Sequence, residues 1–165
     1  PATIRAVVLE AQAVDEDTDL AVADDVLGVG EGIGDMAEMI GELKKINPDL
    51  KVAYHSDGYI YPIIPDMIEI GLDILNPLQP ASMDPVRIKK DFGEHLSFWG
   101  SLDIQKTLPY GSPDDVQREI RERLRTVGQG GGFIVGPSHY IQLDTPMENF
   151  LAMVETVHTT YYPME

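Results

Sequence analysis

The chain has 165 residues, 43% of them apolar and 24% charged, which is the composition of one ordinary globular domain. Its formal net charge of −16 at pH 7 argues against nucleic acid and anionic membrane surfaces as partners, and with no cysteine it has no disulfide bond or thiolate metal ligand. No apolar run approaches the roughly 18 residues that cross a bilayer, and the first residues do not resemble a signal peptide, so a cytoplasmic protein is expected.

The N-terminal part is the least regular region of the chain. Strands are predicted at residues 6–9 and 25–29. Residues 11–25 between them contain six acidic side chains and show no clear period, which predicts a solvated acidic loop. Asp15-x-Asp17-x-Asp19 has the spacing of a calcium loop, but Leu20 replaces the turn glycine and the last acidic ligand is missing. Calcium binding is therefore not expected.

A glycine-rich run follows at residues 28–34, before a helix that is predicted from residue 33 to residue 46. Phosphate-binding loops occur at such strand-to-helix junctions. The run departs from the dinucleotide-binding spacing, however, and no Walker lysine follows it. A flexible turn is favoured over nucleotide binding, with Glu31 placed to reach a substrate pocket.

After residue 50 the chain alternates between strand-like and helix-like segments. Strands are predicted at four places and a helix follows each of them. Helix starts are marked by Asp84-Pro85, by Ser112-Pro113 and by a capping-box pattern at residues 145–148, and Gly71 stands where a helix-terminating glycine is expected. The predicted strands cover residues 51–55, 73–76, 96–100 and 133–135. Such alternation is typical of a parallel sheet with covering helices.

Polar side chains follow each of these four strands. His55 and Asp57 are two residues apart at a strand end, so their side chains point to the same side, where they can bind a metal or share a proton. A hydrogen-bonded turn is the structural alternative. Asn76 and Gln79 follow the next strand, and Asp103 follows the third.

The fourth strand is followed by Ser138 and His139, in a loop that leads into the last predicted helix. A histidine in such a loop is often placed for function, and the alternative is a hydrogen bond to a loop carbonyl. Because the carboxyl ends of parallel strands carry the chemistry of α/β barrels, these side chains are expected to line one site.

Four segments of the chain resemble the uroporphyrinogen decarboxylase-like superfamily, over about residues 42–163. They occur in the family's order, at residues 44–58, 73–77, 99–103 and 136–149. The resemblance implies a (β/α)8 barrel about twice as long as this chain. One branch of the superfamily decarboxylates the acetate arms of uroporphyrinogen without a cofactor. Another branch transfers methyl groups to or from a corrinoid protein and uses zinc.

The resemblance also implies a ligand set. His55 matches the histidine of the methyltransferases' H-x-C pair, Asp57 stands at the first cysteine, and His139 stands at the second. Two histidines and a carboxylate still form a reasonable site for zinc or another divalent metal, and they suit an oxygen or ether substrate better than a thiol. The decarboxylases also have a histidine at the position of His139.

Three functions are compatible with this pattern. The first is a metal-dependent, corrinoid-linked methyltransferase with His139 and Asp103 as catalytic groups, Glu31 or Asp103 as a fourth ligand or proton acceptor, and a pocket lined by Glu31, Asn76, Gln79 and Ser138. The second is a uroporphyrinogen decarboxylase-like carboxy-lyase, although the family's substrate arginines and catalytic aspartate belong to a part that this chain does not match. The third is a catalytically silent, dimerising half-barrel.

The predicted fold is a parallel (β/α) half of a TIM-type barrel at residues 25–165, after a segment at residues 1–24 with no assigned fold. Exposed edge strands and an uncovered barrel interior are costly, so completion by self-association as a homodimer is expected.

Overall fold

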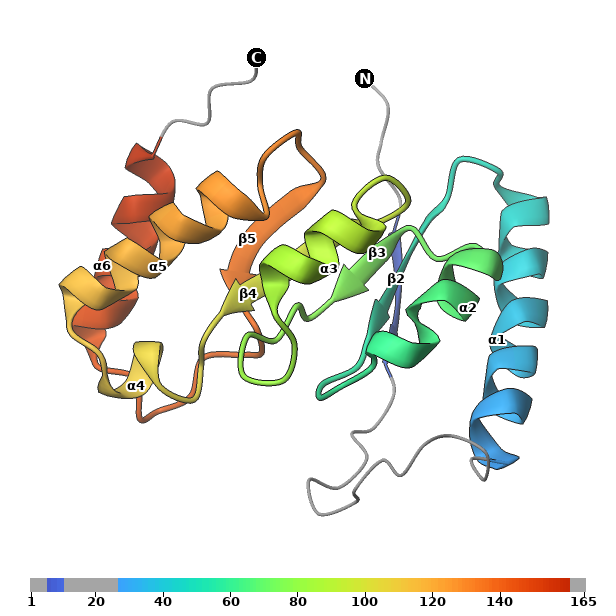
Figure 1. Ribbon diagram of the computed structural model, residues 1–165, viewed down its shortest axis with the longest axis horizontal. Coiled ribbons are helices and arrows are strands. Elements are labelled where there is room, and N and C mark those ends of the chain that lie inside the picture. The colour runs from blue at the N-terminus through green and yellow to red at the C-terminus, as the bar shows by residue number, and fades with distance from the viewer. Residues whose placement is uncertain (1–5, 11–26, 161–165) are drawn as a thin grey trace.

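A computed structural model describes residues 6–10 and 27–160 of the chain, and the side chains from residue 33 onward. Five strands form one parallel sheet in chain order, as Figure 1 shows. They are β1 (Ala6–Glu10), β2 (Lys51–His55), β3 (Ile74–Asn76), β4 (Ser97–Leu102) and β5 (Phe133–Pro137). In a TIM-type barrel, parallel strands lie next to each other in the order of the sequence. This sheet has the same arrangement and forms an arc of such a barrel.

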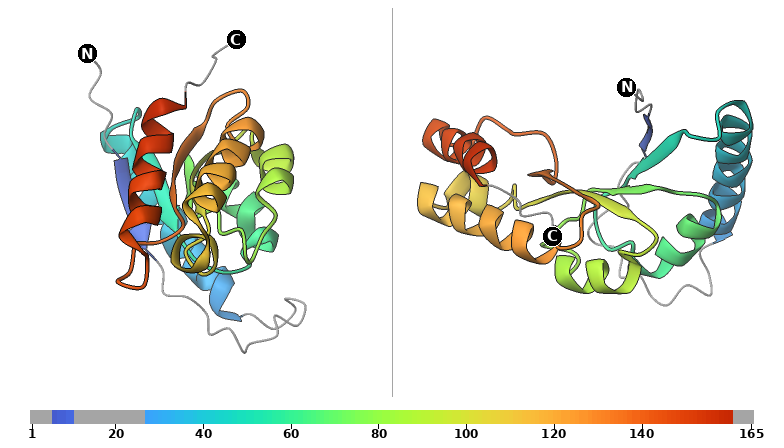
Figure 2. Two further views of the ribbon diagram at one scale, coloured as in Figure 1. Left: turned by 90° about the vertical axis from the view of Figure 1, so that its left-hand side faces the viewer. Right: turned by 90° about the horizontal axis from the view of Figure 1, so that it is seen from above.

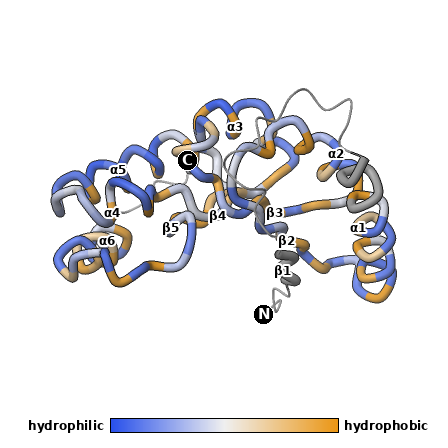
Figure 3. The backbone as a smooth tube through the Cα atoms, turned by 90° about the horizontal axis from the view of Figure 1, so that it is seen from below, coloured by the Kyte–Doolittle hydropathy of each residue, from blue (hydrophilic) through white to orange (hydrophobic). Residues whose placement is uncertain are grey.

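Helices connect the strands on the outer side of this arc. They are α1 (Leu27–Ile46), the 3-10 turn η1 (Tyr61–Ile63) that leads into α2 (Ile64–Glu69), α3 (Pro85–Phe92), α4 (Thr107–Tyr110), α5 (Pro113–Thr126) and α6 (Met147–Thr159). Figure 2 shows the helices along the convex side of the curved sheet, and no helix of the described residues crosses its concave side. Seen from below in Figure 3, the arc has α6 at one end and α1 at the other.

Two hydrophobic clusters join the helices to the sheet. The first places Tyr54, Leu75 and Phe98 of neighbouring strands in one row, which packs against α1, α2 and α3. The second cluster joins the end of β4 to α4, α5 and α6, and its buried members are Leu102, Leu108, Val116, Ile120 and Met153. Since side chains alternate along a strand, the row that includes Trp99 faces the concave side instead.

Most of the predicted elements are confirmed. The strands expected at residues 51–55, 73–76, 96–100 and 133–135 correspond to β2 to β5, and the strand expected at residues 6–9 is β1. Asp84 caps α3 by accepting hydrogen bonds from two backbone N–H groups, and Ser112 forms a capping box with Asp115 at the start of α5. Gly71 follows α2 with a φ of +98°, a left-handed conformation that favours glycine.

The strand and the flexible turn expected near the glycine run are wrong. Helix α1 begins at Leu27, so residues 28–34 lie in its first turns, whereas residues 25 and 26 are outside the described range. Further along the helix, apolar side chains at a spacing of three and four residues pack against the first cluster: Ile33, Met36, Ile40 and Leu43. This continuous apolar stripe outweighs a cost of about 1 kcal/mol for each helical glycine. Glu31 is helical, and its side chain is not described.

The capping box expected at residues 145–148 is also wrong. The N-cap of α6 is Pro146, which has no side-chain acceptor, and no side-chain cap hydrogen bond forms. Because the strand expected at residues 25–29 is replaced by the start of α1, the described sheet has five strands rather than six. The acidic loop and the calcium-like spacing at residues 15–19 lie outside the described residues. Among the described helices, none combines the length and the apolar content that a bilayer crossing requires.

Candidate metal centre

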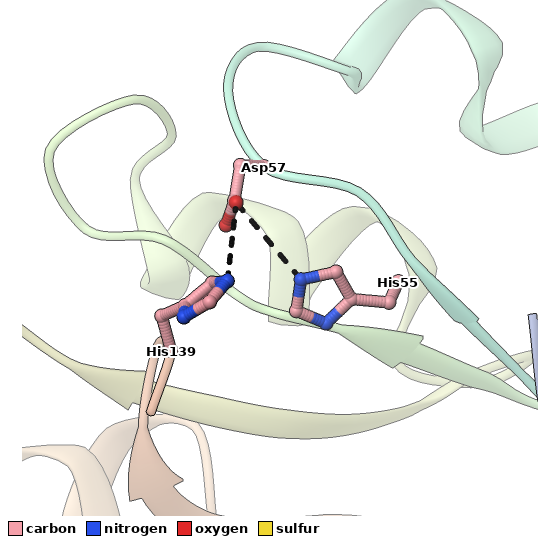
Figure 4. A group of neighbouring side chains, drawn as sticks. All are labelled: His55, Asp57 and His139. Carbon is pink, nitrogen blue, oxygen red and sulfur yellow. Dashed lines mark ion pairs between the residues drawn. The ribbon is translucent and has the colours of Figure 1, made fainter. Parts of the chain in front are cut away.

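Three ionisable side chains converge at the carboxyl ends of the strands. His55 is the last residue of β2, Asp57 lies two residues further along, and His139 lies just after β5. In Figure 4 the two histidine rings approach the carboxylate of Asp57 from either side. One nitrogen or oxygen atom from each of the three residues lies within 4.8 Å of the others. The strands β2 and β5, which have two strands between them in the sheet, therefore contribute to one site through the curvature of the sheet.

Two separations within this trio match those between ligands of one metal ion. Asp57 Oδ2 lies 3.9 Å from His55 Nε2 and 4.0 Å from His139 Nε2. These distances are too long for direct hydrogen bonds. Ligand atoms at about 2.0–2.2 Å from a shared zinc ion stand roughly 3–4 Å apart from each other. The carboxylate of Asp57 therefore stands at a distance from each imidazole at which one metal ion fits between them.

The ring of His55 is held by the neighbouring strand. Its Nδ1 lies 2.5 Å from Oδ1 of Asn76, the last residue of β3. Asn76 is only 5% exposed, and its Nδ2 donates to the carbonyl oxygen of Trp99 in β4 at 3.2 Å. A hydrogen-bonded chain thus runs across three strands and ends on the histidine.

Asp57 lies in a loop that is held by Gln79, a residue in the segment after β3. The backbone N–H of Gly58 donates to Oε1 of Gln79 at 2.7 Å. Gly58 has a φ of +84°, so the chain turns sharply directly after Asp57. Asn76 and Gln79, both predicted to line a substrate pocket, lie beside the trio and hold two of its members. Their contact with a substrate stays a prediction.

Ser138 and His139 follow β5 and differ in their surroundings. Ser138 is buried, and both its hydroxyl and its backbone N–H donate to the carbonyl oxygen of Leu102, at 2.9 Å and 3.0 Å. These bonds fix the β5–α6 loop to the end of β4, so the hydroxyl is occupied in the fold. His139 Nδ1 is buried and has no hydrogen-bond partner among the described residues.

Asp103 is not part of the trio. Its carboxylate accepts hydrogen bonds from the backbone N–H groups of Gln105 at 2.7 Å and Lys106 at 3.0 Å, which caps the turn before α4. It lines a separate cleft of about 510 Å³ beside α4 and α5, to which none of the three converging residues contributes. In that cleft, burial raises the pKa of Glu119 above its ordinary value, although Arg123 pairs with its carboxylate. A catalytic role of Asp103 stays a prediction.

One contributor to the site could not be recognised from its residue type. The carbonyl oxygen of Trp99 accepts hydrogen bonds from Asn76 Nδ2 and from the backbone N–H of Leu78. Every residue has a carbonyl group, so the tryptophan side chain gives no signal of this role.

The residues of the trio fit a divalent metal. Two imidazole nitrogens and one carboxylate are ligands that zinc, iron and related metals accept, and three protein ligands leave further positions open. His55 has its second nitrogen engaged by Asn76, which is the outer-shell contact that ligating histidines commonly make.

Comparison with known proteins places this chain within a family. The family model for uroporphyrinogen decarboxylase (URO-D) matches residues 34–160. Uroporphyrinogen decarboxylase from Legionella pneumophila (strain Corby) is 30% identical over 124 residues, which are 74% of this chain and 34% of that protein. The enzyme of the same name from Psychromonas ingrahamii is 29% identical over 94 residues, or 57% of this chain and 24% of that protein. The chain spans a quarter to a third of the length of these relatives.

A solved structure shows the same architecture. A methyltransferase from Methanosarcina mazei matches with a TM-score of 0.60 and 22% sequence identity, over 75% of this chain and 34% of that one. At this identity the likeness is one of fold, and it confirms a parallel α/β arrangement that resembles part of a TIM-type barrel. The resemblance predicted over residues 42–163 is confirmed as well: with the family model matching residues 34–160, the chain belongs to the uroporphyrinogen decarboxylase family.

Proposed function

We propose that this chain is the metal-holding part of a methyltransferase-like protein that acts on an oxygen-linked methyl group. The observation that carries the proposal is the convergence of His55, Asp57 and His139 within 4.8 Å. The methyl carrier is a corrinoid on a partner protein, which docks over the carboxyl ends of the strands, and the substrate is a small molecule.

The ligand set favours an oxygen substrate. Two imidazoles and a carboxylate form a harder set than thiolates, and hard metals prefer oxygen ligands. A divalent metal held there supplies Lewis acidity that polarises a bound oxygen atom. His55 and His139 contribute neutral nitrogens, Asp57 contributes negative charge, and Gln79 keeps the Asp57 loop in place through Gly58.

The test is the metal content of the protein, purified without chelators or a histidine tag. We expect close to one zinc, iron or similar ion per chain in the wild type and almost none in His55→Ala. His95→Ala is the matched control, because His95 is exposed and lies outside the trio. Wild-type protein without metal, or His55→Ala with the wild-type content, would contradict the proposal.

A second candidate, a uroporphyrinogen decarboxylase-like carboxy-lyase without a cofactor, is favoured by the curated relatives, which bear that name. In this case His139 orients a substrate carboxylate and no metal takes part. Turnover of uroporphyrinogen that persists with a chelator and is lost in His139→Ala would support it. Turnover that stops with the chelator would exclude it.

A further inference from the structure

The orientation of the Asn76 side chain is determined by its two partners. Its Nδ2 donates to the carbonyl oxygen of Trp99, which can only accept, so the amide nitrogen must face β4. The opposite end of the amide, Oδ1, then faces His55 at 2.5 Å. Asn76 is only 5% exposed, which favours these two protein groups over water as the partners of its amide.

This orientation decides which nitrogen of His55 carries the hydrogen. An amide oxygen can only accept, so His55 Nδ1 must donate and therefore carries the hydrogen in the neutral ring. The lone pair then resides on Nε2, the atom that lies 3.9 Å from Asp57 Oδ2. His55 Nε2, which faces the centre of the trio, therefore has a lone pair available for a metal ion in the metal-free protein.

His139 is in the opposite situation. Its Nδ1 is buried without an acceptor among the described residues, and a hydrogen placed there would be a buried, unpaired donor. The tautomer with the hydrogen on Nε2, which faces Asp57, avoids that cost. In the metal-free protein the two histidines are thus unequal: His55 offers a lone pair to the centre, whereas His139 carries a hydrogen on Nε2 and must move it before this atom can bind a metal.

We propose that Asn76 is a positioning residue that fixes His55 in the Nδ1–H tautomer and thereby makes it the anchoring ligand of the trio. The role of His55 as an anchoring ligand rests on the proposed metal site, whereas the tautomer of its ring is a property of the metal-free protein. Outer-shell partners of this kind change metal affinity by about 10- to 100-fold when they are removed.

The first measurement is nitrogen-15 NMR of the histidine rings in the metal-free full chain, at a pH where the rings are neutral. Long-range correlations from the ring protons identify the nitrogen that carries the hydrogen. We expect the Nδ1–H pattern for His55, assigned by its loss in His55→Ala, and the Nε2–H pattern for His139. An Nε2–H pattern for His55 would overturn the proposal, whether or not the protein binds metal.

The second measurement compares variants by Co²⁺ titration, followed optically, with Zn²⁺ as the competitor. Asn76→Leu removes the acceptor, so we expect His55 to leave the Nδ1–H tautomer and the affinity for Co²⁺ to fall about 10- to 100-fold. Asn76→Asp keeps an acceptor and is expected to retain the tautomer. Asn47→Leu is the matched control, because it makes the same chemical change in the turn before β2, where Asn47 accepts from the backbone N–H of Asp49 and lies outside the trio.

The outcomes separate this inference from the proposed function. A folded Asn76→Leu protein with the wild-type tautomer and affinity would overturn the role of Asn76. If Asn76→Leu does not fold, the wild-type ring pattern and Asn76→Asp still decide the question. Wild-type protein that shows the expected tautomers but binds no Co²⁺ would contradict the metal site and leave the tautomer assignment intact.

Discussion

Asn149 is a motif residue whose role in this fold is structural. It lies in the segment that resembles the family, it is only 1% exposed, and its Nδ2 donates to the carbonyl oxygens of Leu108 at 2.9 Å and Gly111 at 2.7 Å. These carbonyls belong to the last turn of α4 and the residue after it, where a helix leaves acceptors unpaired. Asn149 therefore connects α6, and with it the loop that contains His139, to the end of α4.

We expect Asn149→Ala to lower the free energy of unfolding by about 1–3 kcal/mol, because the buried carbonyl group of Leu108 and the partly buried one of Gly111 lose their donor. Urea denaturation measures the difference. Glu148→Ala is the control, since Glu148 is exposed and a surface change of this kind stays within about 0.5 kcal/mol. Equal stability of the two variants would show that the amide contributes nothing.

Asp73 makes the stability of the fold depend on pH. Burial by itself raises the pKa of this carboxyl, but hydrogen bonds from Lys44, from the backbone N–H of Val52 and from Lys51 lower it below the ordinary 3.8. A carboxyl whose pKa is lowered by folding stabilises the folded state above its unfolded pKa, and this contribution is lost as the pH falls through the folded value.

Asp73→Asn tests this dependence. We expect the wild type to be more stable than the variant at pH 7, with the difference shrinking as the pH falls below about 3.8. Denaturation curves recorded at a series of pH values measure the gap. A gap that stays constant down to pH about 3 would show that the charge of Asp73 is not what stabilises the fold.

At the scale of elements, two helix starts that look alike in sequence differ in the fold. Ser112 accepts a hydrogen bond from the backbone N–H of Asp115, whose carboxylate accepts one from the backbone N–H of Ser112. Contacts with Ser112 and then with Arg118 lower the pKa of Asp115 to about 2. Thr145 makes no such contact, because α6 begins one residue later at a proline N-cap.

Ser112→Ala is therefore expected to cost about 1 kcal/mol of stability, the usual value of an N-cap side chain. Thr145→Ala is expected to cost much less, although Thr145 and Ser112 both begin a capping-box pattern in the sequence. Thermal unfolding of the two variants beside the wild type decides the matter. Similar losses for both would mean that the α6 pattern caps the helix after all.

The elements of the fold were predictable to different degrees. Five strands followed from runs of apolar residues between turn residues, whereas the start of α1 did not, because glycine-rich sequence favours turns in the absence of tertiary contacts. The spacing of His55 and Asp57 predicted that they share a side of the sheet. That His139 joins them was implied only by the family resemblance, because it depends on the curvature of the sheet, which residue spacing does not encode.

The contacts around the trio were less predictable still. The pairing of His55 with Asn76 requires the register of β2 against β3, which places these two residues opposite each other. A shift by one residue would turn the amide to the other face. Asp103 was expected to reach the site, but local backbone N–H groups occupy its carboxylate, as short acidic side chains before helices commonly allow.

At the scale of the whole molecule, the sheet formed by the described residues has two open edges, at β1 and at β5. Within the described residues β5 pairs with β4 alone, so one side of its backbone offers unpaired N–H and C=O groups. Many of the exposed large apolar side chains gather in the same part of the chain, on β5, on α6 and in the loop between them: Ile134, Tyr140, Leu143, Met147, Leu151 and Val154. Exposed apolar side chains near an open strand edge favour association with another chain.

We expect the chain to cover this surface by self-association, with the β5 edge of one copy against the open β1 edge of another, which also encloses the strand ends that carry the trio. Ile134 is 51% exposed on β5, so Ile134→Lys places a charge on the contact and is expected to shift the protein towards the monomer. Ile46→Lys is the control, because Ile46 is 83% exposed at the far end of α1. Sedimentation equilibrium over a range of concentrations measures the assembly. A wild-type protein that stays monomeric throughout, or equal dissociation constants for the wild type and both variants, would contradict assembly through β5.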